Sequence, residues 1–477
     1  MSIHTWFRLP RVRRGLAVSM VVLATGGLVL SRTPASAGTP GTPDTHVALA
    51  GGSNAATWSG PGVHGRFALS HTTVLARGEQ RIYAELDLKA DPAERRVERA
   101  PLALAVVLDT SGSMGGEKID RAKDSVVRLI REMRDDDQIA FVRYASDTEL
   151  VQPLARVGSV REALIARVQR IQAEGGTNIP PALRQGLDAL AEAGKGRVRR
   201  VVLASDGLDA SRALSEQIAR DSTNRGITVS SMGIGLDFDE GYMGGVAVAG
   251  HGNFAFVKDG AALATFLHRE LEETATTTAQ NVIARVRLPE GVRFARAIGG
   301  EAHVGAGGDL EIAVGAMFAG DEQRVLVELT ARVPVAQSRG FEGSVAWSVV
   351  GGDTATARFA GVSVTGSDDA LAVDQGRDGA VLANAVSVLA SARQIEAAAA
   401  YERGDTATAR TLIEGNEHDL AAAASAAPAP AAAALMQQQA AYGETKRTFA
   451  APASPKSHAA AKAGAARDFD NMNRKGY

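Results

Sequence analysis

Apolar runs and amphipathic stretches alternate through the middle of the chain. Residues 102–108 read Leu-Ala-Leu-Ala-Val-Val-Leu, a run typical of a strand buried on both faces of a parallel sheet. The next segment is amphipathic, with Ile119 and Val126 on an apolar stripe and Lys118 largely on the polar side. Further strands are predicted at residues 139–144, 148–154, 201–204, 227–234 and 253–257, and further helices at residues 160–171, 181–191, 214–224, 240–247 and 262–274. This alternation predicts a doubly wound, mostly parallel, Rossmann-like α/β domain over residues 101–277.

Strand-like patterns lie on both sides of this domain. Residues 81–88 alternate between apolar and polar side chains with a period of two, which is typical of a half-buried strand. Short apolar runs with Gly-rich turns return between residues 282 and 350. We therefore predict one β-sandwich built from residues 59–100 and 278–366, with the α/β domain inserted between them. A sandwich made only of the later strands is the alternative.

The amino-terminal segment has the pattern of an export signal. Four arginines precede an apolar run at residues 16–30, and Ala35-Ser36-Ala37 follows as a small-residue cleavage site. We expect residues 1–37 to be a cleaved signal peptide. An uncleaved membrane anchor is the alternative, because the apolar run is only somewhat shorter than the roughly 20 residues that span a bilayer.

The remaining segments have biased compositions. Residues 38–58 are rich in Gly, Thr, Pro and Ala and are predicted to be a flexible spacer. Residues 367–420 have apolar positions at helical spacing and are predicted to form a helical hairpin. Residues 421–477 are predicted to be a low-complexity linker and tail.

Composition narrows the classes of partner and metal site. The chain of 477 residues is long enough for two or three domains, and 45% hydrophobic with 22% charged residues is ordinary for a folded protein. Residues 1–37 contain five arginines and no acidic residue, so the rest of the chain has 47 basic and 54 acidic residues and a net charge of −7. This balance disfavours a nucleic-acid partner. The absence of cysteine excludes disulfides and thiolate metal sites.

Oxygen-bearing side chains follow several of the predicted elements. Asp109-Thr110-Ser111-Gly112-Ser113 comes directly after the first buried strand, Gly175-Gly176-Thr177-Asn178 precedes a helix, and Ser205-Asp206-Gly207 follows another buried strand. The carboxyl ends of parallel strands meet at one edge of a sheet, which is where ligands of such folds bind. Hard oxygen ligands of this kind favour Mg²⁺, Mn²⁺ or Ca²⁺. The candidate metal ligands are Asp109, Ser111, Ser113, Thr177 and Asp206.

Together, these segments resemble the metal-ion-dependent adhesion site of von Willebrand factor type A domains, as in integrin I domains. Residues 226–229 and 233–240 are also similar to a bacterial, exported subgroup that is loosely labelled as calcium-activated chloride channel homologues. The resemblance covers about residues 100–276. Leu208-Asp209 departs from the Ala-Asn that is common in the subgroup. Asp209 is expected to lie either at the rim of the site or in a solvated loop, and the solvated loop is favoured. Taken one at a time, the segments also fit ordinary loops with helix caps.

The resemblance implies a role for each candidate ligand. Ser111 and Ser113 would bind the metal directly, and Thr177 would do so in a high-affinity state. Asp109 and Asp206 would act mainly through water molecules. With few direct carboxylates, the cation would retain positive charge and accept an Asp or Glu of a partner protein.

The predicted function is therefore metal-dependent protein binding by an exported protein, with Mg²⁺ as the first choice of cation. We expect a periplasmic or secreted location, or anchoring to the inner membrane by residues 16–30, with membrane contact only through that segment. An envelope scaffold whose metal only stabilises the domain is the alternative. A hydrolase is less favoured, because the sequence has no Gly-x-Ser-x-Gly elbow, P-loop or zinc-protease motif, and we predict no enzymatic activity.

Overall fold

The computed structural model describes residues 53–92, 101–194, 196–206, 209–236, 238–257, 260–350, 352–450 and 454–473. The predicted signal peptide and most of the predicted spacer lie outside these residues. None of the helices in this described part of the chain combines the length and apolar character needed to cross a membrane.

A six-stranded sheet forms the centre of the α/β domain, in the order β10-β9-β8-β5-β6-β7. Its parallel strands are β5 (Leu102–Asp109), β6 (Gln138–Tyr144), β8 (Val198–Ser205), β9 (Ile227–Ile234) and β10 (His251–Val257), and β7 (Thr148–Arg156) pairs with β6 in the antiparallel direction. From β5 the chain proceeds to β6 on one side and later returns to β8 on the other. The strand order thus reverses at β5, and ligands bind at such a reversal in open α/β sheets.

Helices cover both faces of this sheet. Alternate side chains of β5 point to opposite faces, and both faces are apolar. Leu104 and Val106 lie in the apolar core with α1 (Glu117–Glu132), α2 (Val157–Gln169) and α6 (Gly260–Ala275). Ala105 and Val107 lie in the opposite core, with α3 (Ile179–Ala189), α4 (Arg212–Thr223) and α5 (Glu240–Ala249). The continuous apolar run of β5 is therefore buried on both sides, as its sequence predicts.

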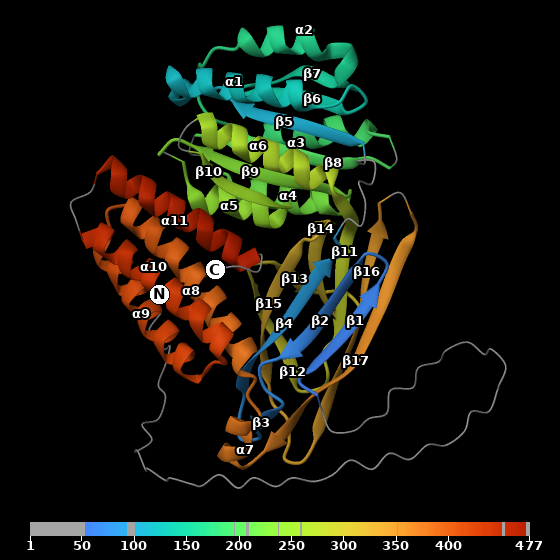
Figure 1. Cartoon of the computed structure of the whole chain (residues 1–477), viewed down its shortest axis with the longest axis vertical. Helices are drawn as coiled ribbons and strands as arrows, with labels where there is room; N and C mark the ends of the chain where they lie inside the picture. Colours follow the sequence, from blue (N-terminus) through green and yellow to red (C-terminus); the bar gives the residue numbers. More distant parts are fainter. Residues whose placement is uncertain are drawn as a thin grey trace, which may run out of the picture. The chain divides into compact units, whose positions relative to one another are not determined.

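Strands from both sides of the α/β domain share one β-sandwich (Figure 1). One sheet contains β1 (Ala55–Gly60), β2 (Val63–Leu69), β4 (Gln80–Ala90), β15 (Glu322–Ala331) and β12 (Val292–Ile298), in that order. The other contains β13 (Glu301–Val304), β14 (Leu310–Phe318), β11 (Thr277–Arg287), β16 (Ser338–Val349), β17 (Thr354–Ser367) and β3 (Thr73–Leu75). Antiparallel pairing of β4 with β15 joins the early and late strands. The predicted insertion is confirmed, and the alternative of a sandwich made only of late strands is wrong.

The first strand of the sandwich begins inside the predicted spacer. β1 starts at Ala55, so the prediction that the spacer extends to residue 58 is wrong for its last residues. The side chain that anchors this strand is Trp58, which is buried and lies with its ring centroid 5.9 Å from that of Trp347 in the opposite sheet. Burial of one large aromatic side chain outweighs the weak strand propensity of the surrounding small residues.

The carboxyl-terminal region is helical to a greater extent than its sequence suggested. The predicted hairpin contains α7 (Ala370–Gln375), α8 (Gly379–Glu402) and most of α9 (Thr406–Ala426). The predicted linker and tail at residues 421–477 is wrong, because α10 (Ala429–Ala450) and α11 (Pro455–Asn473) occupy most of it. Alanine favours helix strongly, and Pro430 and Pro455 lie in the first turns of α10 and α11, where proline is tolerated. Leu435, Tyr442 and Phe449 are buried at a spacing of seven residues.

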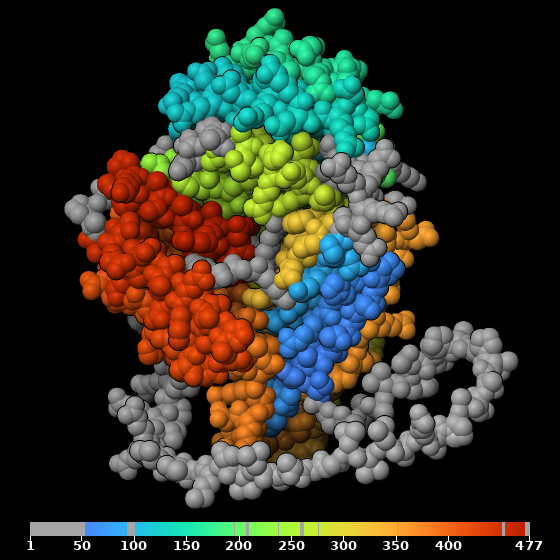
Figure 2. All heavy atoms as spheres, in the orientation of Figure 1, coloured from blue at the N-terminus to red at the C-terminus, as the bar shows by residue number. Residues whose placement is uncertain are grey.

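The last helix, α11, packs against the α/β domain as well as against α8. In Figure 2 the red atoms of the carboxyl-terminal helices meet the yellow-green atoms of that domain. Phe469 lies edge-on to Phe254 of β10, with ring centroids 5.4 Å apart. Lys462, which is only 1% exposed, donates to the Phe238 carbonyl at 3.0 Å and forms an ion pair with Glu240. This helix therefore contacts the segment that follows β9.

Candidate functional site

Asp109 is the last residue of β5, and it is fully buried. Its two carboxylate oxygens are fixed by different neighbours. The Ser111 amide donates to Oδ1 at 2.8 Å, and the Ser205 hydroxyl at the end of β8 donates to Oδ2 at 2.7 Å. These contacts hold the carboxylate at the carboxyl edge of the sheet.

A chain of hydrogen bonds connects Ser111, Ser113 and Asp206. The short 3₁₀ helix η1 (Gly112–Met114) turns both hydroxyls to the same side, with their Oγ atoms 2.9 Å apart. The Ser113 hydroxyl donates to Asp206 Oδ1 at 2.8 Å. Ser111 and Asp206 are buried, whereas Ser113 is exposed, so the cluster opens to solvent at Ser113.

The loop that carries Thr177 lies against the loop after β5. The Gly112 amide donates to the Gly175 carbonyl at 2.9 Å, and the Glu174 amide donates to the Thr110 carbonyl at 2.8 Å. Thr177 is half-buried two residues beyond Gly175. The structure thus brings the Thr177 loop to the site through backbone contacts, whereas the other four candidate ligands are linked by hydrogen bonds among themselves.

The side chains of Ser146, which the sequence reasoning missed, and Asp209 shape the Thr177 loop. Gly175 has a φ of 77°, and a Cβ there would lie 3.0 Å from the Ser146 hydroxyl. That hydroxyl accepts from the Gly176 amide at 2.8 Å. On the other side, Asp209 Oδ2 accepts from the Ile179 amide at 2.7 Å, at the start of α3. Asp209 is half-buried, and its carboxylate ties the segment after Asp206 to the segment after Thr177. Of its two predicted places, these contacts favour the rim of the site.

Lys118 also belongs to the site. The sequence pattern placed it largely on the polar side of α1, but the structure places its ammonium 2.6 Å from Asp206 Oδ2. Its side chain is 29% exposed, and that of Asp206 is fully buried. Helical periodicity placed this lysine away from the apolar stripe of α1. It could not show that Asp206, in the loop after β8, lies within reach of the ammonium.

Burial controls the electrostatics of the site. Burial raises the pKa of the Asp109 carboxyl, the hydrogen bonds from Ser205 and Ser111 lower it, and the negative charge of Asp206 raises it further. Beneath the site, burial raises the pKa of the Tyr144 hydroxyl well above its ordinary value, with a smaller contribution from Asp109. Two buried carboxylates thus lie beside one buried, one half-buried and one exposed hydroxyl, those of Ser111, Thr177 and Ser113. A donor set made only of oxygen, with negative charge beneath it, fits a hard divalent cation.

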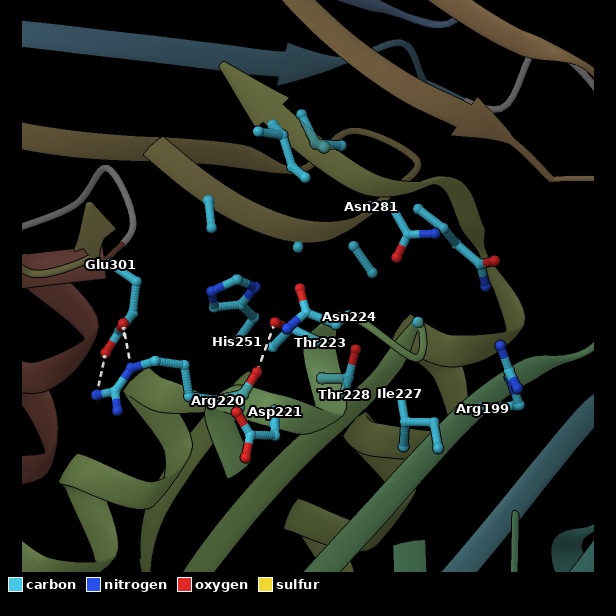
Figure 3. A pocket seen from close by; sticks show the side chains of 18 of the residues that line it. Arg199, Arg220, Asp221, Thr223, Asn224, Ile227, Thr228, His251, Asn281 and Glu301 are labelled. Carbon is cyan, nitrogen blue, oxygen red and sulfur yellow. Dashed lines mark hydrogen bonds and ion pairs between the residues drawn. The ribbon is translucent and has the colours of Figure 1, made fainter. Parts of the chain in front are cut away.

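A separate cavity of about 640 Å³ lies at the opposite ends of β8 and β9 (Figure 3). Arg220 forms two hydrogen bonds with Glu301, of 2.7 and 2.9 Å, at one side of it. The His251 imidazole points into it, its buried Nδ1 has no hydrogen-bond partner, and burial lowers its pKa to about 4. Both His251 and Asn281 have a φ of 53°. This cavity contains none of the predicted ligands, and the sequence reasoning assigned His251 no role.

Comparisons with known proteins cover the α/β domain most closely. The family model of the von Willebrand factor type A domain matches residues 103–269. The chain is 30% identical over 233 residues to YfbK of Escherichia coli K12, which is 47% of this chain and 40% of that protein. It is 29% identical over 116 residues to inter-alpha-trypsin inhibitor heavy chain H4 of Bos taurus, which is 22% of this chain and 13% of that protein. The chain therefore spans less than half the length of either relative.

Solved structures extend the likeness of the fold beyond this domain. A von Willebrand factor type A protein from Catenulispora acidiphila matches 89% of this chain and 98% of its own, with a TM-score of 0.64 and 17% identity. The ArnB paralog VWA2 from Sulfolobus acidocaldarius matches 86% of this chain and 98% of its own, with a TM-score of 0.56 and 15% identity. At these identities the likeness concerns the fold alone. Residues 103–269 of this chain are a von Willebrand factor type A domain, a kind of domain that typically mediates protein–protein interaction.

Proposed function

We propose that this protein binds a divalent cation, Mg²⁺ first, and uses it to bind an Asp or Glu of a partner protein. The proposed ligands are Asp109, Ser111, Ser113, Thr177 and Asp206. The observation that carries the proposal is the hydrogen-bonded chain from Ser111 Oγ through Ser113 Oγ to Asp206 Oδ1. It joins loops from two adjacent parallel strands at a point that is open to solvent.

The chemistry of the donors supports a binding role. A bound cation would supply positive charge at the exposed edge of the sheet. Hydroxyl groups are neutral, so they satisfy the coordination of a cation without cancelling its charge. The two carboxylates are fixed from behind, Asp109 by Ser205 and Asp206 by Lys118. An external carboxylate can therefore approach from the side of Ser113 and complete the set of oxygen ligands.

The proposal includes a location and a class of protein. We infer an exported, non-enzymatic protein of the bacterial envelope, periplasmic or secreted, or anchored to the inner membrane by residues 16–30. The composition of residues 1–37 supports export. Partner binding is favoured over catalysis because the sequence has no Gly-x-Ser-x-Gly elbow, P-loop or zinc-protease motif.

Calorimetric titration with Mg²⁺ and Mn²⁺ tests the metal site. We expect the wild type to bind one cation and the Ser111→Ala/Ser113→Ala variant to bind at least about tenfold more weakly, since two direct oxygen ligands are lost. Ser425→Ala is the matched control, because the Ser425 hydroxyl is exposed on α9 and bonds only locally to the Ala422 carbonyl. Equal cation binding by the wild type and the double variant would refute the proposed ligands.

Affinity capture from the native cell envelope tests the binding role. In the presence of Mg²⁺ the wild type should retain partner proteins that are released by EDTA and are not captured by the double variant. If the cation raises the thermal stability of the domain but capture is the same with and without EDTA, the scaffold alternative is correct instead.

A further inference from the structure

We propose that Lys118 sets the net charge of the metal-loaded site, so that cation binding is weakened and capture of an external carboxylate is strengthened. This inference rests on the proposed function and deepens it, because it assigns a residue that balances the two binding events. Lys118 acts through Asp206 and is therefore a positioning residue for charge, not a ligand of the cation.

The contact with Asp206 carries this inference. The Lys118 ammonium lies 2.6 Å from Asp206 Oδ2, while the other oxygen of the same carboxylate accepts from the Ser113 hydroxyl. The Asp206 side chain is fully buried and that of Lys118 is 29% exposed. Charges interact more strongly where water is excluded, so the ammonium offsets a large part of the negative charge that Asp206 presents to the site.

The fold makes room for this lysine from a second direction. Gly235, directly after β9, has a φ of 83°. A Cβ at this position would lie 3.0 Å from Lys118 Cε and 3.3 Å from Nζ. The glycine therefore leaves open the space that the end of the lysine side chain occupies. The first turn of α1 and the loop after β9 together direct the ammonium to Asp206.

Formal charges show what the ammonium changes. Asp109 and Asp206 contribute −2, Lys118 contributes +1 and a divalent cation contributes +2, so these four groups sum to +1. Without the ammonium the other three would sum to zero. The cation would then be bound more tightly by two uncompensated carboxylates, and an external carboxylate would be attracted less. Lys118 thus lowers the affinity of the site for the cation and raises the affinity of the loaded site for the carboxylate of a partner.

Titration of Mn²⁺ into full-length Lys118→Met measures the first effect. Methionine keeps the length and the apolar stem but removes the charge. We expect the dissociation constant for Mn²⁺ to fall by about tenfold or more, which corresponds to about 1.4 kcal/mol. Lys118→Arg should stay close to the wild type. Lys123→Met is the matched control on the same helix, because Lys123 is ion-paired with Asp120 at 2.9 Å instead.

A carboxylate probe measures the second effect. Acetate is titrated into the Mn²⁺-loaded proteins at constant ionic strength, with the relaxation of water protons as the signal for displacement of metal-bound water. The wild type should bind acetate more tightly than Lys118→Met does. Gly235→Ala provides a second route to the same state, because its Cβ displaces the ammonium while all charges are retained, and it should also tighten Mn²⁺ binding.

The outcomes separate this inference from the proposed function. If the wild type binds Mn²⁺, and Lys118→Met and Gly235→Ala both bind it equally tightly or more weakly, the proposed role of Lys118 is overturned and the metal site still stands. Failure of the wild type to bind Mn²⁺ would overturn both. Tighter Mn²⁺ binding with no loss of acetate affinity would also contradict the proposed balance.

Discussion

Single side chains determine how firmly the loops around the site are fixed. Asp209 shows this most clearly, because Oδ2 accepts from the Ile179 amide and Oδ1 accepts from the Ser211 amide, both at 2.7 Å. One carboxylate thus fixes the start of α3 and the loop after β8. The sequence favoured a solvated aspartate over one at the rim of the site, because the donor at Ile179 lies 30 positions away and no local pattern connects the two.

Replacement of Asp209 by alanine should therefore loosen the site without removing a ligand. We expect a loss of about 1–2 kcal/mol in the free energy of unfolding, as for removal of a helix cap, and weaker cation binding through the Thr177 loop. Asp209→Asn, which keeps an acceptor oxygen, should lose less. Urea denaturation and Mn²⁺ titration measure the two effects, and an unchanged midpoint in Asp209→Ala would contradict this role.

Residue-scale prediction is easiest where neighbours in sequence are also neighbours in space. Asp109, Ser111 and Ser113 lie on one turn, and the structure brings them together with Asp206 at the carboxyl ends of adjacent strands. Ser205, Ser146 and Lys118 were missed as parts of the site. Each reaches it by a contact between different elements of the chain, and such contacts depend on the details of side-chain packing that periodicity does not contain.

At the scale of elements, the strongest patterns gave the right elements. The apolar run of β5 and the apolar stripe of α1 were both predicted from periodicity, because burial on two faces or on one face leaves a clear pattern. Alanine-rich α10 and α11 were not, since alanine is found in linkers as well as in helices. The large residues at a spacing of seven, from Leu435 to Phe449, are the signal that could have identified α10.

The contact of α11 with the α/β domain gives a prediction at this scale. Lys462 is buried beside Glu240, burial raises the pKa of Glu240, and Lys462 lowers it. Lys462→Met leaves that carboxylate buried without this partner, so we expect a loss of about 3–5 kcal/mol in the free energy of unfolding. The Lys462→Met/Glu240→Gln double variant should recover much of it. If the double variant is no more stable to urea than the single one, the ion pair is not what holds α11 in place.

At the scale of the whole molecule, strands from before and after the α/β domain share one sandwich. The return of strand-like patterns after the α/β domain predicted a shared sandwich, and the pairing of β4 with β15 realises it. The packing between the domain and the sandwich was not predicted. It includes Gly315 of β14, whose φ of 91° and missing Cβ accommodate His251 of β10. Such a contact between surfaces of separate elements leaves no periodic signal.

His251 makes this packing sensitive to pH. Burial lowers its pKa to about 4 from an ordinary value of 6.5, so the unfolded chain binds more protons between these values. The stability contributed by neutral His251 is fully present above pH 6.5 and is lost as the pH falls towards 4. His251→Asn, which tolerates the left-handed backbone, should reduce the fall in unfolding free energy across this window by roughly 1–3 kcal/mol.

Chemical denaturation at pH 7 and at pH 4.5 measures this difference. In His251→Asn the pH dependence of the unfolding free energy should decrease without vanishing. Burial also lowers the pKa of His71 to about 4, and the contribution of His71 to the pH dependence remains in the variant. An identical pH dependence in wild type and His251→Asn would show that His251 is not a neutral, buried imidazole.

We propose that oxygen atoms from three loops gather around one divalent cation at the carboxyl edge of the sheet. Anomalous scattering from crystals grown with Mn²⁺ locates this cation. We expect one strong peak within coordination distance of Ser111 Oγ and Ser113 Oγ, beside Thr177, with Asp109 and Asp206 behind it. A structure with saturating Mn²⁺ that has no peak at these serines, or has its peak elsewhere on the chain, would refute the proposed site.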